Sequence, residues 1–133
     1  MTRILVADDD RDARDLFAEL LRFDGHDVVL ARDGIEAERL VRERLPEIAL
    51  IDIFMPRLDG LELIRRMRAQ QPAVRIIAIS AGWRRTSSSD APDVLDDALQ
   101  LGAHATLRKP VKPGELTELV KQLSSTPSGQ AAD

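Results

Sequence analysis

IALIDIFMPRLDG, residues 48–60, decides the fold, because four apolar residues lead directly into one acid, Asp52, and then into a turn. Consecutive apolar residues without polar alternation are typical of a strand that is buried on both faces, as in a parallel sheet. A carboxylate directly behind such a strand is informative, since buried acids are rare unless they are paired. We therefore expect Asp52 to end an interior strand close to other charged groups.

The same pattern recurs along the chain. Four further apolar runs lie at Ile4–Ala7, Val28–Ala31, Val74–Ile79 and Ala105–Leu107. Each of the five runs is followed by apolar residues at helical spacing: Ala13, Leu16, Phe17, Leu20 and Leu21; Ala37, Leu40 and Val41; Leu61, Ile64 and Met67; Val94, Leu95, Ala98 and Leu99; Leu116, Leu119, Val120 and Leu123. In the first helix, Arg14, Asp15, Glu19 and Arg22 are expected to face away from this stripe. Five strand–helix repeats predict an α/β fold, a doubly wound parallel sheet of five strands with helices on both faces.

Length and composition limit the class of protein. The 133 residues fit one domain, which we expect to span residues 1–123, with 124–133 as a flexible tail or a truncated linker. The absence of cysteine excludes disulfides and thiolate metal sites and favours a cytoplasmic protein. No apolar run approaches the ~20 residues of a membrane span, so we expect no membrane insertion. A formal net charge of −4 gives no support to nucleic-acid binding.

The carboxyl ends of the predicted strands carry the reactive side chains. In chain order these are Asp8, Asp9 and Asp10 after the first strand, Asp52 after the third, Ser80 at the fourth and Lys109 at the fifth. Ligands of open parallel sheets bind at this edge, near the point where the strand order reverses. We therefore expect acids, a hydroxyl and an ammonium group to converge there.

Such a cluster favours phosphoryl chemistry. Two carboxylates ~4 Å apart repel each other by about 4 kcal/mol at an effective dielectric constant near 20, so a cation or bound protons are needed. Mg²⁺ suits the cluster, because it accepts a few carboxylates and keeps waters that a phosphate can replace. A carboxylate beside Mg²⁺, the Lys109 ammonium and the Ser80 hydroxyl is suited to attack phosphorus and form an aspartyl-phosphate.

Four segments resemble the signature segments of response-regulator receiver domains, in the order and at the spacing of that family. They are LVADDDR (5–11), ALIDIFMPRLDG (49–60), IIAISAG (76–82) and GAHATLRKP (102–110), and the resemblance covers residues 3–123. It implies the flavodoxin-like strand order 2-1-3-4-5.

The resemblance also implies a role for each site residue. Asp52 would be the phosphoacceptor, Asp9 a direct Mg²⁺ ligand, Asp8 a ligand mainly through water, and the Phe54 backbone carbonyl a further ligand, while Ser80 and Lys109 would contact the phosphoryl oxygens. The Lys109–Pro110 peptide bond is expected to be cis.

On this interpretation the protein is a signalling switch and not an enzyme, since it would accept one phosphoryl group and lose it slowly. The implied phosphodonor is a histidine kinase or a phosphotransfer domain, and the output would be contact with a downstream protein. We expect a monomer or a weak dimer. A degenerate receiver that serves as a phosphate sink, or as an interaction module independent of phosphorylation, is the alternative within the family.

Two other classes share parts of the pattern. A haloacid-dehalogenase-type phosphatase also uses an aspartyl nucleophile with Mg²⁺, and Asp8–Asp10 contains its D-x-D motif, but Asp12 stands where a Thr or Val is expected and Asp52 has no role. A flavodoxin-type flavin site needs a phosphate loop rich in hydroxyls and glycine, whereas Asp8–Asp10 would repel a phosphate.

One position departs from the receiver pattern. Typical receivers carry an aromatic residue three positions before the lysine, where this chain has Thr106, which is small and stiff at χ1. We therefore expect the polar segment 81–92, which contains Trp83, to change on activation instead of the fifth strand.

Overall fold

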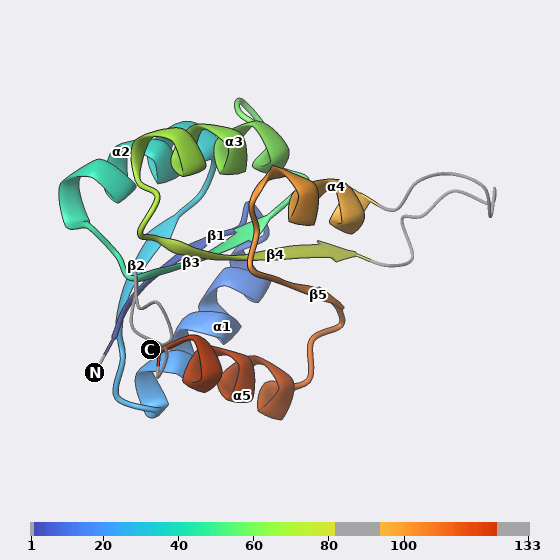
Figure 1. The fold of residues 1–133 in the computed structure, drawn as a ribbon. Coiled ribbons are helices and arrows are strands. Elements are labelled where there is room, and N and C mark those ends of the chain that lie inside the picture. Colours follow the sequence, from blue (N-terminus) through green and yellow to red (C-terminus); the bar gives the residue numbers. More distant parts are fainter. Residues whose placement is uncertain (1, 82–93, 125–133) are drawn as a thin grey trace, which may run out of the picture.

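The computed structural model describes residues 2–81 and 94–124. Strands and helices alternate five times, in the order β1 (Arg3–Ala7), α1 (Arg11–Phe23), β2 (Asp27–Ala31), α2 (Gly34–Arg44), β3 (Ile48–Asp52), α3 (Gly60–Gln70), β4 (Arg75–Ala81), α4 (Val94–Leu101), β5 (Ala105–Lys109) and α5 (Pro113–Ser124) (Figure 1). Residues 82–93, which include Trp83 and nearly all of the segment expected to change on activation, lie outside the described residues.

The five strands form one parallel sheet in the order β2-β1-β3-β4-β5. This confirms the predicted fold class and strand order. The order reverses between β1 and β3, so the carboxyl ends of these two interior strands lie side by side. Ala7 pairs in register with Ile51, and the residues that follow them, Asp8 and Asp52, therefore reach the same edge of the sheet.

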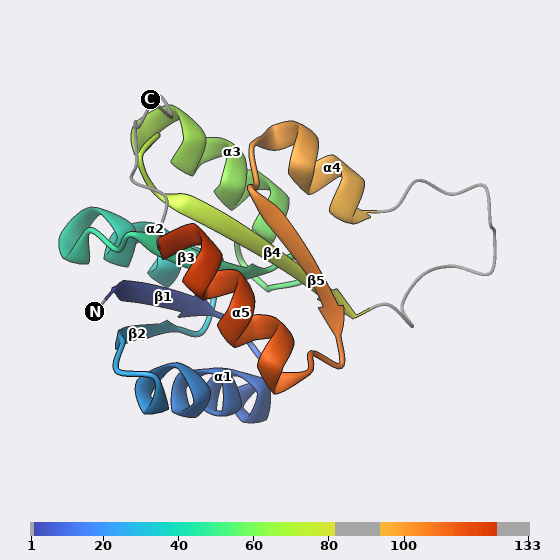
Figure 2. The ribbon, with the colours of Figure 1, turned by 60° about the horizontal axis from the view of Figure 1, so that its bottom comes forward.

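Helices cover both faces of the sheet. Figure 2 shows α1 and α5 on one side, while α2, α3 and α4 lie on the other. Strands β1 to β4 contribute alternate residues to two separate cores: in β1, Leu5 and Ala7 belong to the core under α2 and α3, and Ile4 and Val6 belong to the core under α1 and α5. This double burial explains why the apolar runs show no polar alternation.

The predicted helical stripes are confirmed in outline but wrong at their edges. Leu16 and Leu99 were expected in the core and are 46% and 45% exposed. Leu16 lies about 100° around the helix axis from Phe17, which faces the sheet, so it falls at the solvent side of the stripe. Leu63, which was not predicted as core, is completely buried.

The loop 53–59 connects β3 to α3, and its hydrogen bonds hold the carboxyl end of β3 in place. The N–H of Gly60 donates to the Ile53 carbonyl at 2.8 Å, and Asp59 caps α3 by accepting a hydrogen bond from the N–H of Glu62. A Cβ on Gly60 would lie 2.6 Å from the Asp52 carbonyl oxygen and 2.6 Å from Ile53 Cα. Only glycine lets α3 begin this close to the strand end.

No helix within the described ranges has both the length and the apolar character needed to cross a membrane.

Candidate functional site

Three carboxylates gather at the carboxyl edge of the sheet. Asp8, Asp9 and Asp52 each offer an oxygen, and these oxygens lie within 4.8 Å of one another. Asp8 and Asp52 are 1% and 5% exposed, whereas Asp9 is open to solvent. Within residues 2–81 and 94–124, no other group of three acids or histidines is arranged in this way. The structure thus brings together the acids that the sequence predicted.

Lys109 reaches the acids from the end of β5. Its Nζ lies 3.0 Å from Asp8 Oδ2 and 3.1 Å from Asp52 Oδ2, so one ammonium group is shared between two buried carboxylates. One positive charge cannot neutralise both acids, and the cluster keeps an excess of negative charge. The Lys109–Pro110 peptide bond is cis, as predicted.

Ser80 lies in β4, which pairs with β3. Ile79 stands beside Asp52 in the sheet register, so Ser80 is one residue farther toward the same edge. Its side chain is buried. The backbone of Ser80 therefore reaches the edge of the sheet at which the acid cluster lies.

Asp52 is a carboxyl group whose charge is costly in this site. Burial, together with the neighbouring charge of Asp8, raises the pKa of Asp52 to about 6, although Lys109 and the Phe54 N–H act to lower it. That N–H donates to Asp52 Oδ1 at 3.0 Å. Burial by itself lowers the pKa of the Lys109 ammonium, but the two carboxylates outweigh this effect and raise it overall.

The raised pKa of Asp52 predicts a pH-dependent stability in metal-free protein. The pKa of Asp52 in the folded state, about 6, lies above the ordinary value of 3.8, so protonation of Asp52 stabilises the folded state. This stabilisation is complete below pH ~4 and is lost as the pH rises through about 6. In urea unfolding with EDTA, the free energy of unfolding of wild type relative to Asp52→Asn should therefore fall between pH 4.5 and 7.5. Groups far from Asp52 titrate alike in both proteins and cancel. A constant difference across this range would contradict the prediction.

The donor set fits a hard divalent cation. Asp8 Oδ1 accepts the N–H of Asp10 at 2.9 Å, whereas Asp8 Oδ2 is buried and accepts no hydrogen bond from the described residues, although the Lys109 charge lies beside it. An ion pair without an aligned hydrogen bond leaves a lone pair available. Carboxylate oxygens at this spacing are ligands that Mg²⁺ accepts. Phe54, which the sequence predicts as a carbonyl ligand, lies on the turn that follows Asp52.

Asp10 has a different role from its two neighbours. Its side chain accepts the N–H of Asp12 at 3.1 Å and caps the amino end of α1. Asp10 is absent from the carboxylate cluster. It is therefore a structural residue that terminates the loop carrying Asp8 and Asp9.

Arg14 and Arg22 lie outside the apolar stripe of α1, as predicted, but their guanidinium groups turn back to backbone carbonyls. Arg14 Nη1 donates to the Asp8 carbonyl oxygen at 2.8 Å, and Arg22 Nη2 donates to the Val28 carbonyl at 3.2 Å. Helical periodicity gives the direction in which a side chain leaves the helix, but a long arginine side chain can turn back to a backbone acceptor. Arg14 thus belongs to the surroundings of the acid cluster, and the sequence analysis missed it.

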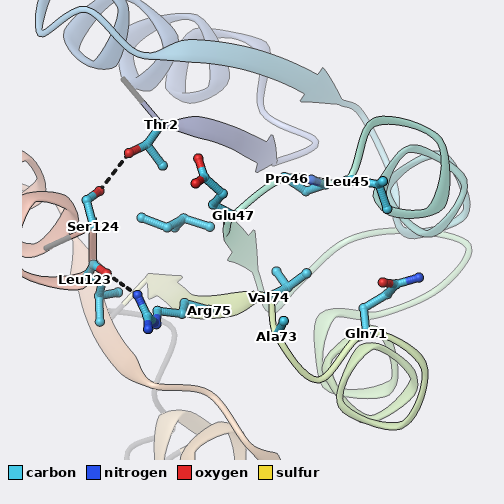
Figure 3. A pocket seen from close by; sticks show the side chains of 11 residues that line it. Thr2, Leu45, Pro46, Glu47, Gln71, Ala73, Val74, Arg75, Leu123 and Ser124 are labelled. Carbon is cyan, nitrogen blue, oxygen red and sulfur yellow. Dashed lines mark hydrogen bonds between the residues drawn. The ribbon is translucent and has the colours of Figure 1, made fainter. Parts of the chain in front are cut away.

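A pocket of about 340 Å³ lies at the opposite edge of the sheet (Figure 3). Its walls include Glu47, just before β3, and Arg75, the first residue of β4, so it opens at the amino ends of the strands. Thr2 Oγ1 and Ser124 Oγ are hydrogen-bonded at 3.1 Å across one side. The pocket contains none of the predicted site residues, and the reactive groups all lie at the other edge.

The comparison with protein families agrees with the fold and with the acid cluster. A family model described as the response regulator receiver domain matches residues 4–121. This chain belongs to the receiver-domain family. The receiver therefore spans nearly all of the described residues.

Known proteins resemble this receiver over most of its length. Response regulator MprA of Mycobacterium sp. (strain KMS) is 39% identical over 121 residues, which are 91% of this chain and 50% of that protein. Response regulator MprA of Mycobacterium leprae (strain TN) is 38% identical with the same coverage. The receiver spans about half the length of these curated relatives.

Solved receiver structures share the fold. A CheY-like response regulator receiver domain protein from Methanospirillum hungatei JF-1 superposes with a TM-score of 0.82 at 29% identity, covering 93% of this chain and 94% of that one. The receiver domain of Francisella response regulator 1452 gives a TM-score of 0.80 at 30% identity, with coverage of 92% and 96%. Membership of this family decides against the dehalogenase-type and flavodoxin-type interpretations.

Proposed function

We propose that this receiver accepts a phosphoryl group on Asp52 from a histidine kinase or a phosphotransfer domain. Mg²⁺ would be held by Asp8, Asp9, Asp52 and the carbonyl of Phe54. The domain would act in the cytoplasm as a stoichiometric switch without catalytic turnover, and its phosphorylated form would be read by another protein.

The observation that carries this proposal is the buried Asp52 carboxylate, which shares Lys109 with a second buried acid. Its oxygen would attack phosphorus as the P–N bond of the donor phosphohistidine breaks. Bound Mg²⁺ would offset the repulsion among the carboxylates and the charge of the phosphoryl oxygens. Asp8 Oδ2 is buried beside the Lys109 ammonium and has no hydrogen-bond partner among the described residues, which supports a ligand role for Asp8.

Lys109 and Ser80 would bind the phosphoryl oxygens of the aspartyl-phosphate. Lys109 already lies within ion-pair distance of Asp52, so its ammonium group would need only a small movement to contact a phosphoryl oxygen there. The Ser80 hydroxyl, at the same edge one strand away, would donate a hydrogen bond to a second phosphoryl oxygen. Phosphorylation adds ~1.5–2 negative charges, which gives both donors a strong partner.

The test uses wild-type protein and a small phosphodonor. With acetyl phosphate and Mg²⁺, we expect intact-mass spectrometry to show one added phosphoryl group per chain. With acetyl phosphate and EDTA, the added mass should disappear, because the carboxylates then repel the incoming anion. No addition in Mg²⁺, or equal addition in EDTA, would refute the proposed mechanism.

A further inference from the structure

Arg14 stands out among the residues around the acid cluster. It is the fourth residue of α1, its side chain is half-buried, and its guanidinium donates to the Asp8 carbonyl oxygen at 2.8 Å. No carboxylate of the described residues lies within ion-pair distance of it. A cation near the amino end of a helix opposes the helix dipole. Helix stability therefore does not explain this arginine, and its contact with the Asp8 carbonyl needs another reason.

Asp9 gives that reason, because its own side chain is unrestrained. Its carboxylate is exposed and makes no hydrogen bond or ion pair with the described residues. The direction of this carboxylate is then set by the two peptide groups on either side of Asp9. Arg14 holds the first through the Asp8 carbonyl, and Asp8 Oδ1 holds the second through the Asp10 N–H at 2.9 Å.

The rest of the loop is anchored as well. The Asp8 N–H donates to the Ala31 carbonyl of β2 at 3.2 Å, and the Arg14 N–H donates to the Asp10 carbonyl at 2.9 Å. Among these anchors, the Arg14 guanidinium is the contact made by a side chain to the peptide that precedes Asp9. Removing it would free that peptide without deleting any of the carboxylates.

We propose that Arg14 is a positioning residue of the divalent-cation site, acting through the Asp8 carbonyl to orient Asp9. This inference rests on the proposed Mg²⁺ site. Arg14 has two opposite effects on a bound cation: its positive charge repels the cation, and its hydrogen bond preorganises the ligands. If Arg14 is a positioning residue, removing it should raise the Kd for Mg²⁺. If Arg14 is only a nearby positive charge, removing it should lower that Kd.

The experiment is calorimetric titration of the metal-free full chain with Mg²⁺ alone. Loss of a group that orients a metal ligand typically costs 10–100-fold in affinity, so we expect Arg14→Ala to raise the Kd for Mg²⁺ about 10-fold. Arg14→Lys should recover part of this loss, because an ammonium group can still donate to the carbonyl. Thermal unfolding in EDTA checks that each variant is folded, and Arg14→Gln replaces Arg14→Ala if the alanine variant is not.

Arg11→Ala is the matched control. Arg11 lies on the same turn of α1, is 83% exposed and pairs with Asp15 at 3.7 Å, so its removal takes away one positive charge without freeing the Asp8 peptide. Its Kd for Mg²⁺ should stay the same or fall slightly. Unchanged or tighter Mg²⁺ binding by Arg14→Ala would overturn the inference and leave Arg14 as a simple charge.

Titration with Ca²⁺ separates a positioning role from a change of charge, because a change of charge should alter the affinities for Mg²⁺ and Ca²⁺ alike. Mg²⁺ requires near-ideal octahedral ligands, whereas Ca²⁺ tolerates irregular ones, so misplacing Asp9 should weaken Mg²⁺ more than Ca²⁺. An equal loss for both ions would contradict positioning. If wild type itself neither binds Mg²⁺ nor becomes phosphorylated, the proposed function fails; if it does both and Arg14→Ala binds Mg²⁺ like wild type, only the role of Arg14 fails.

Discussion

Asp52→Asn is expected to abolish phosphorylation of this receiver by acetyl phosphate and Mg²⁺. An amide oxygen is neutral and a far weaker nucleophile than a carboxylate, and the substitution also removes one of the three acidic ligands of the cluster. The phosphoryl group that we expect mass spectrometry to show on wild type should therefore be missing from the variant. Because asparagine matches aspartate in size, the fold should be retained.

Asp10→Asn is the control for this experiment. Asp10 is the next acid along the same loop but caps α1, and asparagine is an equally good N-cap residue. This variant should be phosphorylated like wild type. Persistent labelling of Asp52→Asn, or a hydroxylamine-resistant phosphoryl group on a serine, would show that Asp52 is not the acceptor.

Gly60→Ala is expected to lower the stability of this domain strongly. The new Cβ would lie 2.6 Å from both the Asp52 carbonyl oxygen and Ile53 Cα, and these are backbone atoms that cannot rotate away. Overpacking of this kind costs ~1–3 kcal/mol and sometimes more. A loss of about 3 kcal/mol corresponds to a fall in Tm on the order of 10 °C for a domain of this size. Differential scanning calorimetry measures it directly.

Gly114→Ala supplies the comparison. Gly114 lies in the first turn of α5, and a Cβ there would meet nothing within 4 Å. Alanine favours a helix over glycine, so this variant should match wild type or gain up to ~1 kcal/mol. Equal Tm values for Gly60→Ala and Gly114→Ala would show that the β3–α3 turn can relax. Since the Gly60 clash includes the Asp52 carbonyl, its variant should also accept the phosphoryl group more slowly.

The sequence alone determined the architecture and most of the site. Apolar runs without alternation predicted buried parallel strands, and the strand ends placed Asp8, Asp9, Asp52, Ser80 and Lys109 at one edge. These predictions held because strand burial and the direction of a parallel strand depend on short stretches of chain. The strand order came from the resemblance to receivers, since local periodicity does not say which strands are neighbours.

The tertiary structure decided where long side chains end. It assigned Lys109 to Asp8 and Asp52 together, left Asp8 Oδ2 without a hydrogen bond, and turned Arg14 back onto the Asp8 carbonyl. Helical spacing had placed Arg14 only off the apolar stripe of the first helix. A lysine or arginine side chain has several rotatable bonds, so its charged end is placed by acceptors from distant strands and loops, and only the folded chain brings those acceptors within reach.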